Sequence, residues 1–170
     1  GMGNNGGDGL ALARMLTTAG VRVDVYVIAL SDKATPDFEI NKQRLSIMDV
    51  NVCNVSSAEE ILLSSSVDVI VDAVLGSGLM RPLEGEVAKI IEKINAFDAE
   101  KIAIDMPSGL FADRSSVGNT VFKANHTITF QFPKLPFFFP ENEQFVGEFY
   151  VLDIGLHSRY IAQTATSMYY

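Results

Sequence analysis

The chain has 170 residues, 48% of them hydrophobic, which is typical of one globular domain and excludes a disordered chain. A formal net charge of -8 excludes the basic face that a nucleic-acid-binding protein normally shows. Cys53 is the single cysteine, which excludes an internal disulfide. No apolar run is long enough to span a membrane. We therefore expect a cytoplasmic protein without nucleic-acid or membrane partners.

The first nine residues contain five glycines and stand directly before a helix pattern. Glycine lets the backbone approach a ligand closely, and a helix N-terminus offers unpaired N–H groups that bind phosphate. Asn4 and Asn5 add amide donors and acceptors, and Asp8 is placed to cap the helix that follows. We interpret the stretch as a ligand-binding loop, with a purely structural turn as the alternative.

The rest of the chain alternates between helical and extended patterns. Helical spacing predicts helices over 10–19, 36–48 and 83–97, and a capping box formed by 56–60 predicts another. Alternation or continuous apolar runs predict strands over 21–29, 51–55, 67–74, 101–105, 126–132 and 147–154. This order predicts an α/β fold: a three-layer, Rossmann-like domain with a mostly parallel sheet and right-handed crossovers.

Both ends of the sequence look cut from something longer. Glycine-rich loops of this kind follow a strand, so we expect the first strand and the N-terminal helices of the fold to be missing. The polar segment from His157 to Tyr170 is interpreted as the start of a linker. The domain itself is then expected to span residues 1–156.

Two acidic residues stand at the ends of predicted strands, where open parallel sheets bind ligands. Asp72 lies in an apolar strand before the loop 76–82, and Asp105 ends another strand shortly before Ser108. A buried carboxylate is costly unless it is paired, hydrogen-bonded or bound to a cation. Amide, carboxylate and hydroxyl oxygens suit a hard cation rather than zinc or copper. The alternative is that these carboxylates only cap loop amides.

Other candidates have structural alternatives of equal or greater weight. His126 is expected to be structural and His157 solvated, while Arg81 either binds a phosphate or faces solvent. The phenylalanines 137–139 after Lys134 are expected in the core or a subunit contact rather than in a pocket. No Ser/His/Asp order with a nucleophile elbow is present, so hydrolase chemistry is unsupported.

These motifs, in this order, resemble the NAD(P)H-hydrate epimerase family, the YjeF N-terminal domain. The resemblance covers nearly the whole chain. Its matching residues are Gly3–Gly9, Val71–Ala73, Gly76–Gly78, Arg81-Pro82, Ala103–Gly109, Thr129-Phe130, Lys134 and Asp153–Gly155.

The resemblance implies an isomerase of nicotinamide nucleotide repair. Its substrates would be NADHX and NADPHX, whose (R) and (S) forms are interconverted at C6 of the hydrated nicotinamide ring. The (S) form then serves an ADP- or ATP-dependent dehydratase, which bifunctional members carry as a second domain after the linker. A homodimer is also implied.

The resemblance further implies a potassium ion held by Asn5, Asp72 and Ser108. It places Asp105 against the hydrated nucleotide, and we interpret Asp105 as the acid/base group because epimerisation moves protons and no histidine is well placed. The implied substrate-binding residues are Asn4, Asn5, Gly6, Gly7, Asp8, Gly76, Ser77, Gly78, Leu79, Met80, Arg81, Pro82 and Asp105.

Two alternatives stay open from the sequence. One is a non-catalytic scaffold or interaction domain of the same fold. The other is a generic nucleotide-binding module, with Asp24 or Asp32 at the ribose. The oxygen-rich set of Asn5, Asp72, Asp105 and Ser108 favours the enzyme, because a scaffold has no physical need for it.

Overall fold

The computed structural model describes residues 1–29 and 33–164, so Asp32 lies outside the described residues. Helices and strands alternate, and all strand pairs are parallel, which confirms the α/β class. None of the described helices is long and apolar enough to cross a membrane.

The elements are α1 (Asn4–Thr18), β1 (Asp24–Ile28), α2 (Pro36–Leu45), β2 (Asn51–Val55), η1 (Ala58–Glu60), β3 (Val69–Asp72), α3 (Gly85–Asn95), β4 (Glu100–Ile104), β5 (His126–Phe130), η2 (Leu135–Phe138), η3 (Pro140–Asn142), α4 (Glu143–Val146), β6 (Glu148–Leu152) and α5 (Ser158–Gln163).

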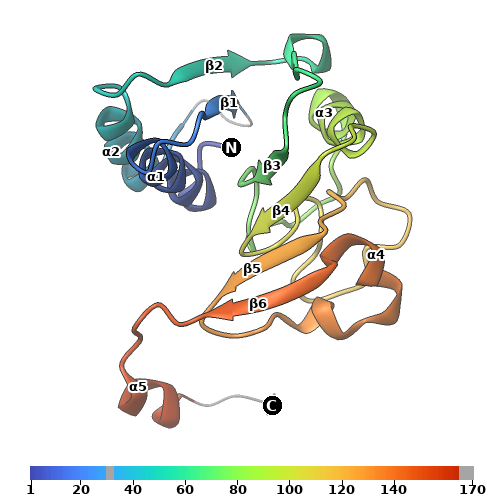
Figure 1. Ribbon diagram of the computed structural model, residues 1–170. Coiled ribbons are helices and arrows are strands. Elements are labelled where there is room, and N and C mark those ends of the chain that lie inside the picture. Colours follow the sequence, from blue (N-terminus) through green and yellow to red (C-terminus); the bar gives the residue numbers. More distant parts are fainter. Residues whose placement is uncertain (30–32, 165–170) are drawn as a thin grey trace.

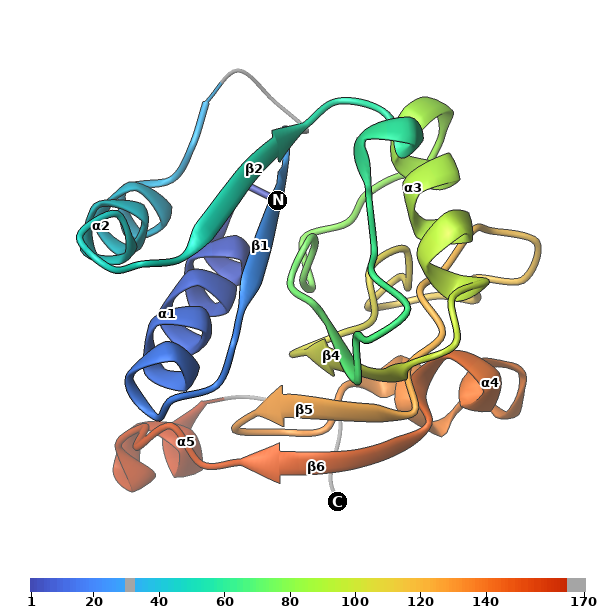
Figure 2. The same ribbon diagram turned by 45° about the horizontal axis from the view of Figure 1, so that its top comes forward.

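The parallel strands fall into two sheets (Figures 1 and 2). One contains β1 and β2, and the other has the order β3-β4-β5-β6. β1 and β3 each pair on one side only, and both line a cavity of about 700 Å³. A further parallel strand would find hydrogen-bond partners at these two edges. The two sheets therefore face each other across this cavity at β1 and β3.

Helices cover both faces of the β1-β2 sheet, which gives three layers. Val25 and Val27 pack with the buried residues of α1 and α2, whereas Tyr26 and Ile28 pack with α3 and η1. Successive side chains of a strand point to opposite faces, so the alternating apolar pattern supplies both contacts. Figure 1 shows α1 and α2 together beside these strands, with α3 apart from them.

The first helix begins earlier than the sequence pattern predicts. Gly3 is its N-cap, so the glycine-rich stretch forms the first turns of α1 rather than a loop. The prediction of Asp8 as N-cap is therefore wrong. Close packing explains the glycines: a Cβ on Gly9 would lie 2.5 Å from the Cβ of Ala73, and one on Gly7 would lie 3.3 Å from the backbone of α2.

The prediction of a helix after the capping box at 56–60 is also wrong. Only a three-residue 3₁₀ turn, η1, forms there. Glu60 accepts a hydrogen bond from the Ser56 N–H at 2.7 Å, four residues away, and the N-cap Ser57 makes no side-chain cap bond, so no capping box forms. Propagation then fails because the following serines bond locally, with the Ser64 hydroxyl accepting from the Ser66 N–H at 3.2 Å. Such local bonds compete with a helix.

Most other differences lie at element ends. The Thr35 hydroxyl accepts from the Phe38 N–H at 3.4 Å and caps α2 as predicted, but α2 ends at Leu45 rather than near Met48. Several strands are shorter than their apolar patterns: β1 covers Asp24–Ile28 and β3 covers Val69–Asp72. Within the predicted linker, residues 158–163 form α5 and residues 165–170 lie outside the described residues.

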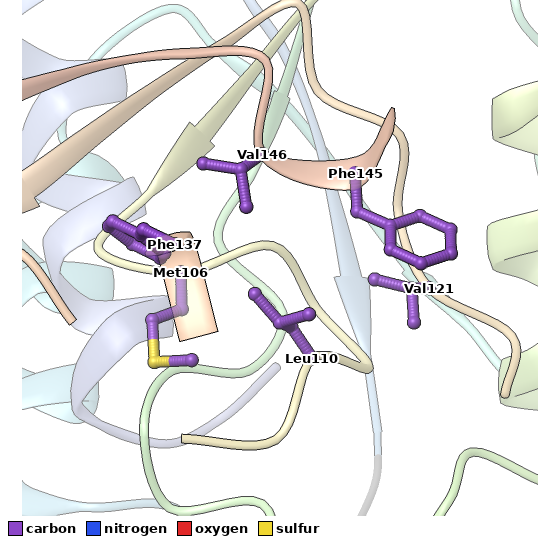
Figure 3. Packing of buried hydrophobic residues seen from close by; sticks show 6 residues of the cluster. All are labelled: Met106, Leu110, Val121, Phe137, Phe145 and Val146. Atoms are coloured by element: carbon purple, nitrogen blue, oxygen red, sulfur yellow. The ribbon is translucent and has the colours of Figure 1, made fainter. Parts of the chain in front are cut away.

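An apolar cluster supports the loop after β4 from both sides (Figure 3). Met106 and Leu110 flank the segment that contains Ser108, and both are buried. Phe137 of η2 is also in this cluster, which agrees with the core interpretation of its segment, whereas Phe138 is 52% exposed. Each large buried side chain of this kind contributes about 1.5–3 kcal/mol. The other members are Val121, Phe145 and Val146.

Gly109 closes this loop at a position that should tolerate no side chain. Its φ is +98°, and a Cβ there would overlap the Thr120 carbonyl oxygen. We expect Gly109→Ala to lower the free energy of unfolding by roughly 2 kcal/mol more than Gly118→Ala, measured by urea denaturation. Gly118 is the matched control, because its φ is +83° but a Cβ there would have no atom within 4 Å. Equal losses would show that crowding at Gly109 is unimportant.

Candidate functional site

The centre of the site is a hydrogen-bonded pair of buried residues, Asp72 and Ser108. Asp72 ends β3 and is 3% exposed, while Ser108 follows β4 and is fully buried. The Ser108 hydroxyl donates to Asp72 Oδ1 at 2.7 Å, and the Ser108 N–H donates to Oδ2 at 2.7 Å. The Val74 N–H donates to Oδ1 at 3.0 Å. These contacts join the carboxyl ends of two neighbouring strands.

Burial dominates the electrostatics of Asp72. Loss of solvent raises the pKa of this carboxyl above its usual value, and the hydrogen bonds from Ser108 and Val74 oppose that shift. A nearby cation would have the same opposing effect. The pair is therefore a place where an added positive charge lowers the free energy of the folded protein.

Asn5 is the third side chain that the sequence predicts at this centre. Its side-chain Oδ1 and Nδ2 are both buried, and neither has a hydrogen-bond partner among the described residues. Asn5 lies against Gly76, where a Cβ would be 3.4 Å from the Asn5 Cβ. Buried amides are normally satisfied, so an unpartnered one indicates a missing water, ion or ligand.

The donor set suits a hard cation held without transition-metal ligands. No group of three His, Cys, Asp or Glu side chains in the described part of the chain is arranged to hold a metal. The Asn5 amide, the Asp72 carboxylate and the Ser108 hydroxyl supply only oxygen and amide groups, which are typical ligands of hard cations. The unpartnered amide and the costly buried carboxylate both fit such an ion.

Asp105 follows β4 in a constrained backbone conformation. Its φ is +64°, a left-handed value that non-glycine residues adopt at a cost. Asp105 Oδ1 lies 2.9 Å from Lys134 Nζ and accepts hydrogen bonds from the Thr129 hydroxyl and the Phe130 N–H, both at 3.2 Å. The Asp105 carboxylate is thus attached to the end of β5.

Asp8 of α1 completes a group of acidic residues at this edge of the sheet. Partial burial raises the pKa of the Asp8 carboxyl, and the negative charges of Asp105 and then Asp37 raise it further. Asp8 and Asp105 are therefore close enough to interact.

The loop 76–82 joins this site only in part. Gly76 contacts Asn5, and the guanidinium of Arg114 donates to the Met80 carbonyl oxygen at 2.7 Å. Met80 itself is 79% exposed. Arg81 faces solvent, which leaves its phosphate contact a prediction. The other loop residues named from the sequence are half-buried Leu79 and exposed Ser77, Gly78 and Pro82.

Sequence reasoning placed Lys134 in a motif but gave it no role, and it did not identify Thr129 or Arg114 as site residues. Thr129 and Lys134 reach Asp105 from β5 and from the segment after it. Arg114 stacks over the Phe111 ring, with 4.0 Å to the ring centroid. The charged Lys134 beside prolines was the one available signal, because a lysine in an apolar segment needs an acceptor.

His126 has the structural role that the sequence suggested. It heads β5, and its Nε2 lies 3.2 Å from Glu100 Oε1 at the opposite end of the strands from Asp105. His157 caps α5, with its Nδ1 accepting from the Arg159 N–H at 3.2 Å. Neither histidine lies among the site residues described above.

Most of the chain matches one known protein family. Residues 1–136 match the family described as YjeF-related protein N-terminus. The chain is similar to the NAD(P)H-hydrate epimerases of Rhodopirellula baltica (36% identical over 156 residues) and Oenococcus oeni (40% over 158). It covers 64% and 72% of those proteins, and 92% of this chain is aligned in each case.

Two further comparisons concern domain organisation and fold. The chain is 39% identical over 158 residues to the bifunctional NAD(P)H-hydrate repair enzyme Nnr of Thermofilum pendens, with 91% of this chain and 30% of that protein covered. The crystal structure of yeast ynu0 superposes with a TM-score of 0.64 and 24% identity, over 79% of this chain and 56% of that one. This structural likeness supports the Rossmann-like fold.

The proximity of Asp8 and Asp105 can be tested by titration. We expect Asp105→Asn to lower the pKa of Asp8, because it removes a negative charge that disfavours ionisation of Asp8. Carbon-13 NMR of the side-chain carboxyl groups measures the shift. Asp37→Asn should lower the Asp8 pKa by a smaller amount, and exposed Asp98→Asn serves as the control. An unchanged Asp8 titration in Asp105→Asn would contradict the arrangement.

Proposed function

Because the chain belongs to the YjeF-related N-terminal family, we propose that it is an isomerase that interconverts the (R) and (S) forms of NAD(P)H hydrate at C6. The supporting observation is the attachment of Asp105 to Thr129 and Lys134 beside the Asp72–Ser108 pair. A scaffold protein has no need for this group of buried and constrained polar residues. Similarity to curated epimerases over most of the chain supports the same activity.

Asp105 has the proposed acid/base role. At C6 the substrate carries a hydroxyl group and the ring nitrogen N1, so inversion requires one bond at C6 to break and re-form. A carboxylate that removes a proton and later returns it assists both stages. The constrained backbone and the three contacts to Oδ1 hold the Asp105 carboxylate in one orientation, as such a group requires.

The nucleotide is proposed to bind across the N-terminus of α1. The unpaired N–H groups in its first turn favour an anionic group such as the pyrophosphate. The residues proposed to contact the nucleotide are Asn4, Asn5, Gly6, Gly7, Asp8, the loop 76–82 and Asp105. Gly6 and Gly7 are buried and let this end of the helix pack closely against its neighbours.

A potassium ion is part of the proposal, held by Asn5, Asp72 and Ser108. Its charge would offset the buried Asp72 carboxylate and attract the negative nucleotide. The observations that support the ion are the unpartnered Asn5 amide on α1 and the hydrogen-bonded Asp72–Ser108 pair at the ends of β3 and β4.

A dehydratase partner also belongs to the proposal, either as a fused domain or as a separate protein. The name of the Thermofilum relative, a bifunctional repair enzyme, supports the fused arrangement. The homodimer and the cytoplasmic location expected from the sequence stay predictions.

The acid/base assignment predicts the behaviour of Asp105→Asn. An amide cannot take up the proton, so kcat for conversion of (R)- to (S)-NADHX should fall by about 100-fold or more. The two epimers are separated by chromatography, with exposed Asp98→Asn as the control. Full activity of Asp105→Asn together with an active wild-type protein would exclude Asp105 as the acid/base group. Inactivity of the wild-type protein would count against the activity itself.

The potassium site predicts a dependence on the cation. Replacing potassium with choline at constant ionic strength should reduce the rate of epimerisation and lower the melting temperature, because the Asp72 carboxylate loses its counter-charge. In Asn5→Ala, the melting temperature should respond less to potassium. A wild-type protein that behaves identically in potassium and choline would exclude the ion, whatever its activity.

A further inference from the structure

The two carboxylate oxygens of Asp105 have different surroundings. Three groups converge on Oδ1: the Thr129 hydroxyl and the Phe130 N–H donate hydrogen bonds to it, and the Lys134 ammonium forms an ion pair with it at 2.9 Å. In the part of the chain that the structure describes, Oδ2 accepts no hydrogen bond. An oxygen that already makes these three contacts has little remaining capacity to accept a substrate proton. The other oxygen keeps its lone pairs available.

Lys134 is held as firmly as the carboxylate it contacts. Besides Asp105, its ammonium donates to the carbonyl oxygens of Phe130 at 2.9 Å and Phe132 at 3.2 Å. Two of the three N–H donors of the Lys134 ammonium are thus used by backbone carbonyl oxygens, and its charge is paired with the Asp105 carboxylate. The Lys134 side chain is 23% exposed and that of Asp105 is 15% exposed. The ammonium is therefore held on three sides by oxygen atoms of the protein.

The backbone on both sides of this contact is unusual. Asp105 and Gln131 are the two non-glycine residues with positive φ, +64° and +62°, among those described. Gln131 lies between the two residues whose carbonyl oxygens bind Lys134, and its N–H donates to the Leu152 carbonyl oxygen at 2.8 Å. Left-handed residues are costly and persist where the surroundings hold them. One strained position thus carries the carboxylate, and the other lies in the segment whose carbonyl oxygens bind Lys134.

We propose that Lys134 is a positioning residue that holds Oδ1 of Asp105, so that Oδ2 is the oxygen that removes and returns the substrate proton. This inference rests on the proposed epimerase function. The C6 hydroxyl transfers its proton to Oδ2, and its oxygen forms a carbonyl with C6. The C6–N1 bond breaks and its electron pair stays on N1, delocalised into the carboxamide. Closure on the opposite face reverses each step, and Oδ2 returns the proton to the hydroxyl oxygen.

The chain contains a matched lysine that separates positioning from stability. Lys101 is 8% exposed, and its ammonium donates to the carbonyl oxygens of Phe97 and Ala99, at 2.5 and 3.2 Å. Lys101 thus also satisfies two backbone carbonyls, but it lies at the start of β4 and has no carboxylate partner in those contacts. Lys101→Met and Lys134→Met should cause comparable losses of stability.

The test compares steady-state epimerisation of (R)-NADHX by the wild-type protein and by these variants. Lys134→Met should lower kcat by about 100-fold, since misplacing a reacting group by roughly 1 Å has an effect of that size. KM should stay within about threefold, because Lys134 holds Asp105 rather than the substrate. Lys134→Arg should recover part of kcat, and Lys101→Met should keep wild-type kcat despite a lower melting temperature.

A second variant probes the same oxygen without removing a charge. Thr129→Val deletes one neutral donor to Oδ1 and preserves the shape of a fully buried side chain. It should lower kcat several-fold with KM unchanged, and it decides the question if Lys134→Met does not fold.

Three outcomes would overturn the inference while the wild-type protein is active: wild-type kcat in Lys134→Met, wild-type kcat in Thr129→Val, or equal losses of kcat in Lys134→Met and Lys101→Met. Failure of the proposed function would appear separately, as a wild-type protein that does not convert (R)-NADHX.

Discussion

The buried carboxylate of Asp72 is the constraint on which the arrangement of this site depends. A carboxylate at 3% exposure must be compensated locally, and Ser108 does this with both its backbone N–H and its hydroxyl. The Ser108 hydroxyl in turn accepts from the Leu75 N–H at 2.8 Å, so the segments after β3 and β4 are held against each other. Displacing either segment would leave a buried charge unsatisfied.

Apolar packing also helps to keep Ser108 in place. Met106 and Leu110 are almost fully buried on either side of it, and Gly109 allows the chain to turn where a side chain would meet the Thr120 carbonyl oxygen. Hydrogen bonds to a charged group contribute about 1.5–3 kcal/mol each in net terms, which is similar to the burial of one large apolar side chain. The cluster in Figure 3 and the bonds to Asp72 therefore both stabilise this loop, and the hydrogen bonds also specify its geometry.

Apolar packing and a polar side chain also have separate roles in α1, the helix that reaches the site. α1 packs against α2 through Leu10, Ala13 and Phe38, which positions its N-terminus. Gly9 then permits contact with Ala73, at a distance that any side chain would prevent. Asn5 consequently lies beside Gly76, with a buried amide that no described residue satisfies. Packing thus leaves an unsatisfied polar group against the loop that follows the buried acid, an arrangement that favours binding an ion or ligand over stability alone.

The sequence by itself determined the α/β class, the parallel strands and the polar residues at strand ends, because hydrophobic periodicity and the placement of Asp72 and Asp105 are local properties. It also determined the family, through ordered motifs. The sequence pattern misplaced the start of α1, because glycines that pack closely in a helix have the same composition as a loop. It also predicted a helix after Ser57 that does not form, because serine side chains there bond to the local backbone. Only the tertiary structure decided that the strands form two sheets and that Lys134 and Thr129 bind one oxygen of Asp105. Those contacts join residues more than 20 positions apart, and no local pattern encodes which oxygen stays open.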